Sequence, residues 1–151
     1  MNEDAIFSLR GEERLYDMLS LLPSYLGQLY LRGGHHGKGI ECLHKSLEVR
    51  VMEIDGDLSE VSWAEHNIGE GYITMGEYDK AMGWLEKGAE TWKEWAKLPS
   101  ETPRRSWAPF QHITMASCLL YMDRSKEARA VLEPTYQEYL ANVTEQWTNA
   151  A

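Results

Sequence analysis

Residues 67–89 read NIGEGYITMGEYDKAMGWLEKGA, and the stretch 42 positions earlier, residues 25–47, reads YLGQLYLRGGHHGKGIECLHKSL. The small, aromatic and leucine positions of the two stretches correspond: Gly27, Tyr30, Gly39 and Leu43 in the first, Gly69, Tyr72, Ala81 and Leu85 in the second. A repeat of about 20 to 50 residues is typical of stacked architectures, in which one unit is too small to bury its apolar face alone. The spacing therefore predicts a solenoid.

Apolar residues within and after these stretches recur three or four positions apart, which predicts helices. One such stripe consists of Ile40, Leu43, Leu47, Val51 and Ile54. Short turns at Gly33-Gly34, Gly76-Glu77 and Asp123-Arg124 separate the helices of each pair, so paired helices are expected to run antiparallel. No alternating apolar and polar run is long enough to predict a strand.

The second stretch resembles a tetratricopeptide repeat. That family places a small residue, then Tyr, Ala, a large apolar residue and a second small residue at fixed intervals, and Gly69, Tyr72, Ala81, Leu85 and Gly88 meet all five. The first unit matches with Gly39 in place of Ala, and the third, around Ala116 and Ala128, matches less closely. The 42-residue length is similar to the longer kinesin-light-chain type of repeat.

The resemblance implies an all-α fold: a right-handed superhelix (α-solenoid) of three antiparallel helix pairs plus an N-terminal capping helix. We expect a single domain over residues 1–151, with the cap at 1–20, repeat units at about 21–55, 58–97 and 107–148, and an inserted loop at 98–109. Three prolines exclude a regular helix in that loop. The insertion also explains why Ala81 corresponds to Ala128 at a spacing of 47 instead of 42.

Composition limits the classes of partner. The 151 residues, 43% hydrophobic and 26% charged, suffice for one sizeable core. A net charge of −9 opposes binding to phosphate backbones, so we expect no nucleic acid and favour a basic or apolar protein or peptide. No run approaches the roughly 20 apolar residues of a membrane span, and the first residues lack a secretory signal, so a cytoplasmic protein without membrane partners is expected. Two reduced thiols at Cys42 and Cys118 are favoured over a disulfide.

The resemblance also implies that binding takes place on the concave surface formed by the first helix of each pair. The family's groove positions correspond to Gln28, Arg32, Trp63, His66, Glu70, Ile73, Phe110, Ile113, Ser117 and Tyr121. Aromatic anchors among polar groups are typical of protein-recognition sites, although Trp63 and Phe110 could instead only pack against neighbouring helices. The interpretation is a non-catalytic interaction module that binds a peptide or partner helix. The alternatives are a regulatory or small-ligand-binding module using the same groove, or a homo-oligomerising fragment of a larger multidomain protein.

Other chemistries find little support in the sequence. Members of the family that capture chaperone C-termini use a clamp of Lys, Arg and Asn, of which only Asn67 is present at the matching positions. The pairs His35-His36 and His66/Glu70 do not complete any metal-binding motif. Cys118 and His112 lie on different sides of one expected helix, and no phosphate-binding loop occurs. We therefore expect no metal, no cofactor and no enzymatic activity.

Two further features could serve partners. Trp84 and Trp95 lie off the apolar stripe of their helix, so either the loop at 98–109 covers them or they form an exposed docking patch. The last helix carries more apolar residues than one neighbour can cover, which suggests self-association through it. These residues are Tyr136, Tyr139, Leu140, Val143 and Trp147.

Overall fold

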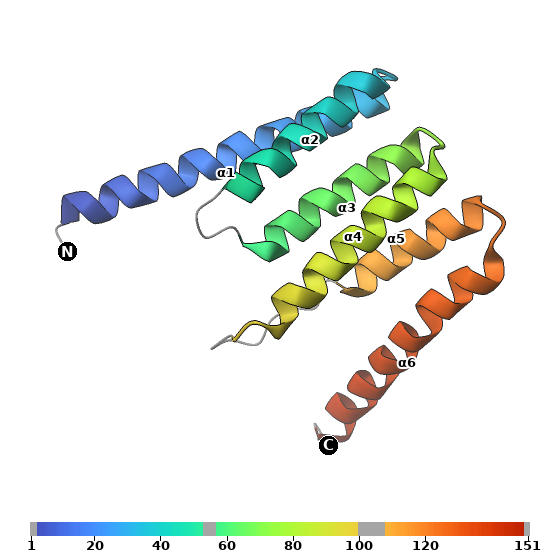
Figure 1. The fold of residues 1–151 in the computed structure, drawn as a ribbon. Helices are drawn as coiled ribbons and strands as arrows, with labels where there is room; N and C mark the ends of the chain where they lie inside the picture. The colour runs from blue at the N-terminus through green and yellow to red at the C-terminus, as the bar shows by residue number, and fades with distance from the viewer. Residues whose placement is uncertain (1–2, 53–56, 100–107, 150–151) are drawn as a thin grey trace. The chain divides into compact units, whose positions relative to one another are not determined.

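The computed structural model describes residues 3–52, 57–99 and 108–149, with side chains over 18–52, 57–99 and 108–141. These residues form six α-helices and no strand, which confirms the predicted all-α helical repeat (Figure 1). The helices are α1 Glu3–Arg32, α2 His36–Met52, α3 Leu58–Thr74, α4 Tyr78–Lys97, α5 Ala108–Tyr121 and α6 Ser125–Asn149. Contacts divide the chain into unit 1, residues 1–99, and unit 2, residues 100–151. The right-handed winding stays a prediction.

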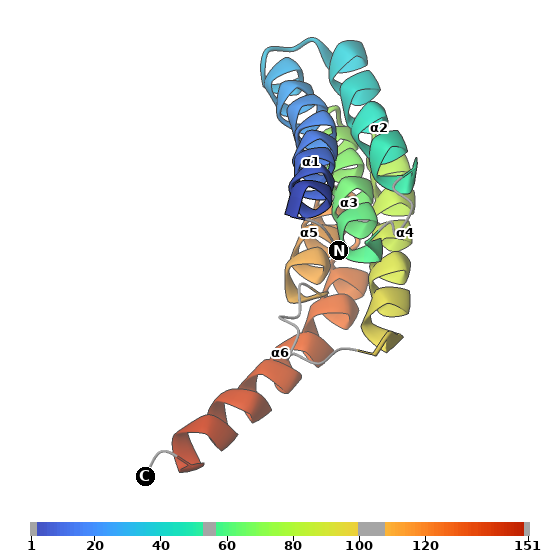
Figure 2. The same ribbon diagram turned by 90° about the vertical axis from the view of Figure 1, so that its left-hand side faces the viewer.

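Unit 1 contains two antiparallel helix pairs, α1 with α2 and α3 with α4 (Figure 1). Helix α3 packs along both helices of the first pair (Figure 2). The core between the pairs consists of Leu31, Leu43, Leu47, Val61, Ala64 and Ile68, with Ile40, Tyr72, Met75 and Trp84 packed against it. Because these residues come from all four helices, neither pair buries its apolar face alone.

Small residues set how closely the helices of each pair approach. A Cβ atom on Gly27 would lie 2.9 Å from the backbone oxygen of Gly39 and 2.9 Å from Cγ of Leu43. A Cβ atom on Gly69 would lie 2.7 Å from Cγ of Leu85 and 3.3 Å from the backbone oxygen of Ala81. The same crossing thus occurs in both repeats, 42 residues apart, because only small residues let the two helices approach this closely.

The turns within the three pairs share one hydrogen-bonding pattern. Gly34 and Gly76 have φ angles of 77° and 75°, and Asp123 takes the third equivalent position with φ 58°. The amide of the following residue donates to a carbonyl five residues earlier: His35 to Tyr30 at 2.8 Å, Glu77 to Tyr72 at 3.0 Å and Arg124 to Leu119 at 2.9 Å. This pattern satisfies carbonyls that a helix end leaves unpaired. The predicted turn positions are therefore confirmed, including the left-handed Asp123.

Two boundaries differ from the expectation. No separate capping helix occupies residues 3–20, because α1 runs without a break from Glu3 to Arg32 and contains Pro23. A single glycine in this segment, Gly11, costs a helix only about 1 kcal/mol and does not end it. Ala108 and Pro109, expected in the inserted loop, form the first turn of α5. Proline is tolerated there because the backbone N–H that it lacks would have no partner within the helix. Residues 100–107 of that loop lie outside the described residues.

Trp84 packs against residues that the sequence did not predict as its neighbours. Its ring meets His44 of α2 edge-on at 5.2 Å between centroids, and Nζ of Lys87 lies 4.8 Å from its centroid. Burial lowers the pKa of His44, with Lys87 adding to this effect and Glu48 opposing it. Trp84 is therefore held by the first helix pair, and neither the loop nor an exposed patch is needed to explain it.

Unit 2 is an antiparallel pair in which α6 is longer than α5 and runs past its end (Figure 1). Ala116, Leu119 and Ala128 are buried in it. On one side of the pair, Nδ1 of His112 lies 2.6 Å from Oγ1 of Thr135. Cys118 is buried, Cys42 of unit 1 is half-buried, and neither forms a disulfide.

Candidate protein-interaction surface

In unit 1 the predicted groove positions lie on α1 and α3 and differ in exposure. Arg32 is exposed, whereas Gln28, Trp63, Glu70 and Ile73 are half-buried. Helices α1 and α3 are in contact, so these side chains come from neighbouring elements. Unit 1 thus offers a mostly polar surface with one partly accessible tryptophan.

A buried arginine holds that tryptophan. The guanidinium of Arg50, on α2, lies 5.3 Å from the ring centroid of Trp63, and the Arg50 side chain is only 4% exposed. Nη1 of Arg50 also forms an ion pair with the carboxylate of Glu60 at the start of α3. Trp63 and Glu60 therefore fix the second helix pair onto the first, and part of the Trp63 ring is used for packing.

His66 and Asn67, two polar residues of α3, are buried. The His66 side chain is 1% exposed, and its Nε2 lies 3.7 Å from Oε1 of Glu70 one turn later. Nδ2 of Asn67 donates to Oγ of the buried Ser24 at 3.4 Å, which joins α3 to α1. His66 is an interior residue here, because α3 is covered on that side, and the proposed surface does not include it.

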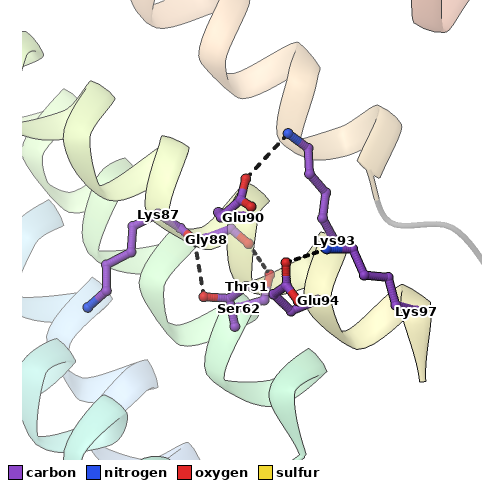
Figure 3. Close-up of polar contacts among 8 residues, drawn as sticks. All are labelled: Ser62, Lys87, Gly88, Glu90, Thr91, Lys93, Glu94 and Lys97. Atoms are coloured by element: carbon purple, nitrogen blue, oxygen red, sulfur yellow. Dashed lines mark hydrogen bonds and ion pairs between the residues drawn. The ribbon is translucent and has the colours of Figure 1, made fainter.

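The outer helix of the second pair carries paired charges. Figure 3 shows Lys93 beside Glu90 and Lys97 beside Glu94, with Nζ–Oε distances of 3.5 and 2.6 Å. Oγ of Ser62 donates to the Gly88 carbonyl at 2.7 Å and holds α3 close to this helix (Figure 3). Exposed ion pairs of this kind contribute little to stability, and they are typical of a helix face that is in contact with solvent.

A further set of polar contacts links α3 and α4. The carboxylate of Glu65 on α3 is 3% exposed and receives Lys87 at 3.2 Å and the hydroxyl of Thr91 at 2.6 Å. Glu65 is buried but satisfied by both partners, as buried charges require. Neither Arg50 nor Glu65 stood out in the sequence, because a buried charge and a surface charge look alike there.

In unit 2 the predicted positions Phe110, Ile113 and Tyr121 form, together with Leu120, an exposed apolar strip along α5. Phe110 is 47% exposed, Ile113 53%, Leu120 58% and Tyr121 64%. These residues are spaced so that they lie on one side of a helix. The hydroxyl of Ser117, between them, donates to the Ile113 carbonyl at 2.8 Å and lies along the helix. We name Phe110, Ile113, Leu120 and Tyr121 the α5 strip.

A cavity of about 650 Å³ lies between α5 and α6, beside the α5 strip. Its wall contains Ile113 of the strip and both apolar or aromatic and polar residues of α6. Those residues include Leu132, Tyr136 and Tyr139. Arg129 and Glu133, an ion pair at 3.2 Å, also line it. In the sequence, Tyr136 and Tyr139 indicated only self-association, because the cavity depends on how α6 packs against α5.

The described residues lack both a metal-binding cluster and a membrane-spanning helix. No three His, Cys, Asp or Glu side chains among them gather closely enough to hold a metal ion. Within the same residues, no helix combines the length and apolar character needed to cross a membrane.

Comparisons with known proteins agree with the geometry. A tetratricopeptide repeat family model matches residues 18–94, about half of the chain. The crystal structure of the TPR domain of Arabidopsis FLU is similar in fold, with a TM-score of 0.64 at 16% identity, covering 86% of this chain and 98% of that one. No curated protein matches the chain in sequence. The kinesin-light-chain type of repeat stays a prediction. With two equivalent helix pairs built on the repeat's small and aromatic positions, the chain belongs to the tetratricopeptide repeat family, whose members serve as protein-interaction scaffolds.

Proposed function

We propose that the chain is a non-catalytic module that binds a peptide or partner helix, and that the α5 strip supplies the apolar anchor. The observation that carries this proposal is the exposure of four large apolar side chains on one face of one helix. Apolar patches of this kind mark interaction sites more often than isolated apolar residues do. In unit 1 the positions Arg32, Trp63, Glu70 and Ile73 would provide a separate, mostly polar surface.

The dimensions of the α5 strip suit a helical ligand. From Phe110 to Tyr121 a helix rises about 16 Å, which equals three turns of a partner helix. An amphipathic helix presents its apolar residues at matching intervals, the mode of recognition known as helix-in-groove. Helix α5 contains no Asp, Glu, Lys or Arg, so specificity on this face depends on shape and apolar contacts.

Charge favours one class of partner. The net charge of −9 attracts a basic partner over distances of about a Debye length and repels an acidic one. The expected ligand is therefore an amphipathic segment with Lys or Arg flanking an apolar face. Cys42 and Cys118 form no disulfide, which fits the reducing cytoplasm that we propose as the location of the chain.

The cavity of unit 2 favours a second candidate function, binding of a small apolar ligand. Its volume of about 650 Å³ falls within the range of ligand pockets. Tyr136 lines the cavity but does not belong to the α5 strip, whereas Leu120 belongs to the strip but not to the cavity. These two residues therefore separate the two candidates.

The test uses 16-residue peptides selected from a displayed random library against the wild-type chain, with affinities measured by fluorescence anisotropy. We expect Leu120→Ser and Tyr121→Ser each to weaken binding about tenfold or more, since anchor residues contribute more than 1 kcal/mol. Val51→Ser on α2, 62% exposed and thus comparable with Tyr121, is the control and should bind normally. Unchanged affinity in both strip variants would refute the proposal, and loss only in Tyr136→Ser would favour the cavity.

A further inference from the structure

Helix α1 carries a second apolar stripe, which ends one turn before the exposed groove position Arg32. Met18 is 58% exposed, Leu22 61%, Tyr25 62% and Leu29 65%. Their spacing of four, three and four residues places them in one line along the helix. The opposite face of α1 is the buried one, with Ser20, Ser24 and Leu31. We name Met18, Leu22, Tyr25 and Leu29 the α1 stripe.

The 42-residue repeat allows this face of α1 to be compared with the equivalent face of α3. Forty-two residues later, the equivalents of Leu22 and Tyr25 are Ala64 and Asn67, which are only 2% and 5% exposed. The equivalent of Leu29 is Gly71, where an added Cβ would lie 3.0 Å from side-chain atoms of both Ile40 and Leu43 on α2.

In α3, then, this face packs on the preceding helix pair. In the part of the chain that the structure describes, no helix pair covers the α1 stripe. Its residues are larger than their equivalents in α3, and all of them are apolar.

Charge points to a second copy of the chain as the occupant. From Met18 to Leu31, α1 contains no Asp, Glu, Lys or Arg, although the whole chain carries a net charge of −9. Two copies repel each other across most surfaces, and an uncharged face reduces that repulsion. The apolar residues of α6, by comparison, lie among the exposed Glu133 and Glu138.

We propose that the chain forms a symmetric dimer in which two α1 helices pack antiparallel through the α1 stripe. A two-fold axis near Pro23 and Ser24 places Met18 opposite Leu29 and Leu22 opposite Tyr25 of the other copy. Such an interface is self-complementary, as two-fold symmetry requires. With the flanking Leu19 and Leu26, 47% and 44% exposed, it buries on the order of 1,000 Å² in total, near the lower size of specific interfaces.

The first measurement is the molar mass of the full chain by light scattering, at concentrations up to about 500 μM. We expect twice the 17.4 kDa of one chain. Leu22→Glu and Tyr25→Lys should each be monomeric at about 50 μM, with unchanged helical circular dichroism because both positions are exposed. Tyr139→Glu on α6, also 62% exposed, is the matched control and should remain dimeric.

The second measurement tests the antiparallel arrangement. Mixing Leu22→Glu with Tyr25→Lys should restore a dimer, since the two new charges of opposite sign face each other across the axis. A strictly monomeric wild type at about 500 μM overturns the proposal, and so does a dimer that Tyr139→Glu abolishes while Leu22→Glu does not. A mixture that stays monomeric overturns the antiparallel pairing. Peptide binding by the α5 strip should be unaffected in Leu22→Glu and in Tyr25→Lys, so the two proposals fail independently.

Discussion

The close approach of α1 and α2 makes Gly27 the most informative single position for stability. In Gly27→Ala the new Cβ would lie 2.9 Å from the backbone oxygen of Gly39 and 2.9 Å from Cγ of Leu43. Comfortable separations between carbon atoms are about 3.5–4.0 Å, so one of the helices must move by several tenths of an ångström. Leu43 is only 1% exposed and cannot move into solvent, and Gly39 presents its backbone.

The magnitude follows from two opposing effects. Overpacking a tight core contact costs about 1–3 kcal/mol. Replacing glycine by alanine within a helix contributes about 0.5–1 kcal/mol of stability. We therefore expect Gly27→Ala to lower the free energy of unfolding by about 1–2 kcal/mol. Gly83→Ala in α4, where the new Cβ meets nothing within 4 Å, should raise it by about 0.5–1 kcal/mol.

Urea denaturation followed by circular dichroism and tryptophan fluorescence measures both variants on the full chain. Because the chain divides into two units, hydrogen exchange of amides in α1–α4 checks that the change lies in unit 1. The expected result is a difference of about 2 kcal/mol between the two variants, with opposite signs relative to wild type. Equal stabilisation by both substitutions would show that the close helix crossing does not constrain Gly27.

Three further changes test other parts of the structure. Glu60→Ala should cost more unfolding free energy, about 1–3 kcal/mol, than Arg50→Met, because the former leaves a buried guanidinium without its carboxylate; the reverse order in urea titrations would show that pairing with Glu60 is not what keeps the buried Arg50 stable. Since burial lowers the pKa of His44 below its unfolded value of 6.5, the unfolded chain binds more protons just below pH 6.5, and stability should fall as the pH decreases from 6.5 through the folded pKa. His44→Gln should remove that part of the pH dependence in melts between pH 7.5 and about 5, and identical profiles would argue against it. Asp123→Gly should stabilise unit 2 by about 0.5–1 kcal/mol by relieving the positive φ, measured by thermal unfolding, with no gain expected if Asp123 is unstrained.

Local signals were sufficient for the helices and turns. The spacing of apolar residues and the glycines at 34 and 76 depend only on neighbours within a few positions, so the sequence predicted them well. The recurrence of Gly27, Gly39, Gly69 and Ala81 indicated the close crossings for the same reason. The cap failed as a prediction because no local signal distinguishes a separate helix over residues 3–20 from the start of a longer one.

The tertiary structure decided which side chains remain accessible. His66 and Trp63 lie one turn apart on α3, and the sequence predicted both as groove residues. His66 is nevertheless buried, and the Trp63 ring packs against Arg50 from α2. Trp84 is covered by His44, far away in the sequence. The sequence by itself determined the repeat, its helices and the family, because these follow from regular spacing along one chain. Burial depends on atoms brought close from other repeats, and only the folded chain shows that the α5 strip and the α1 stripe are left uncovered in the described residues.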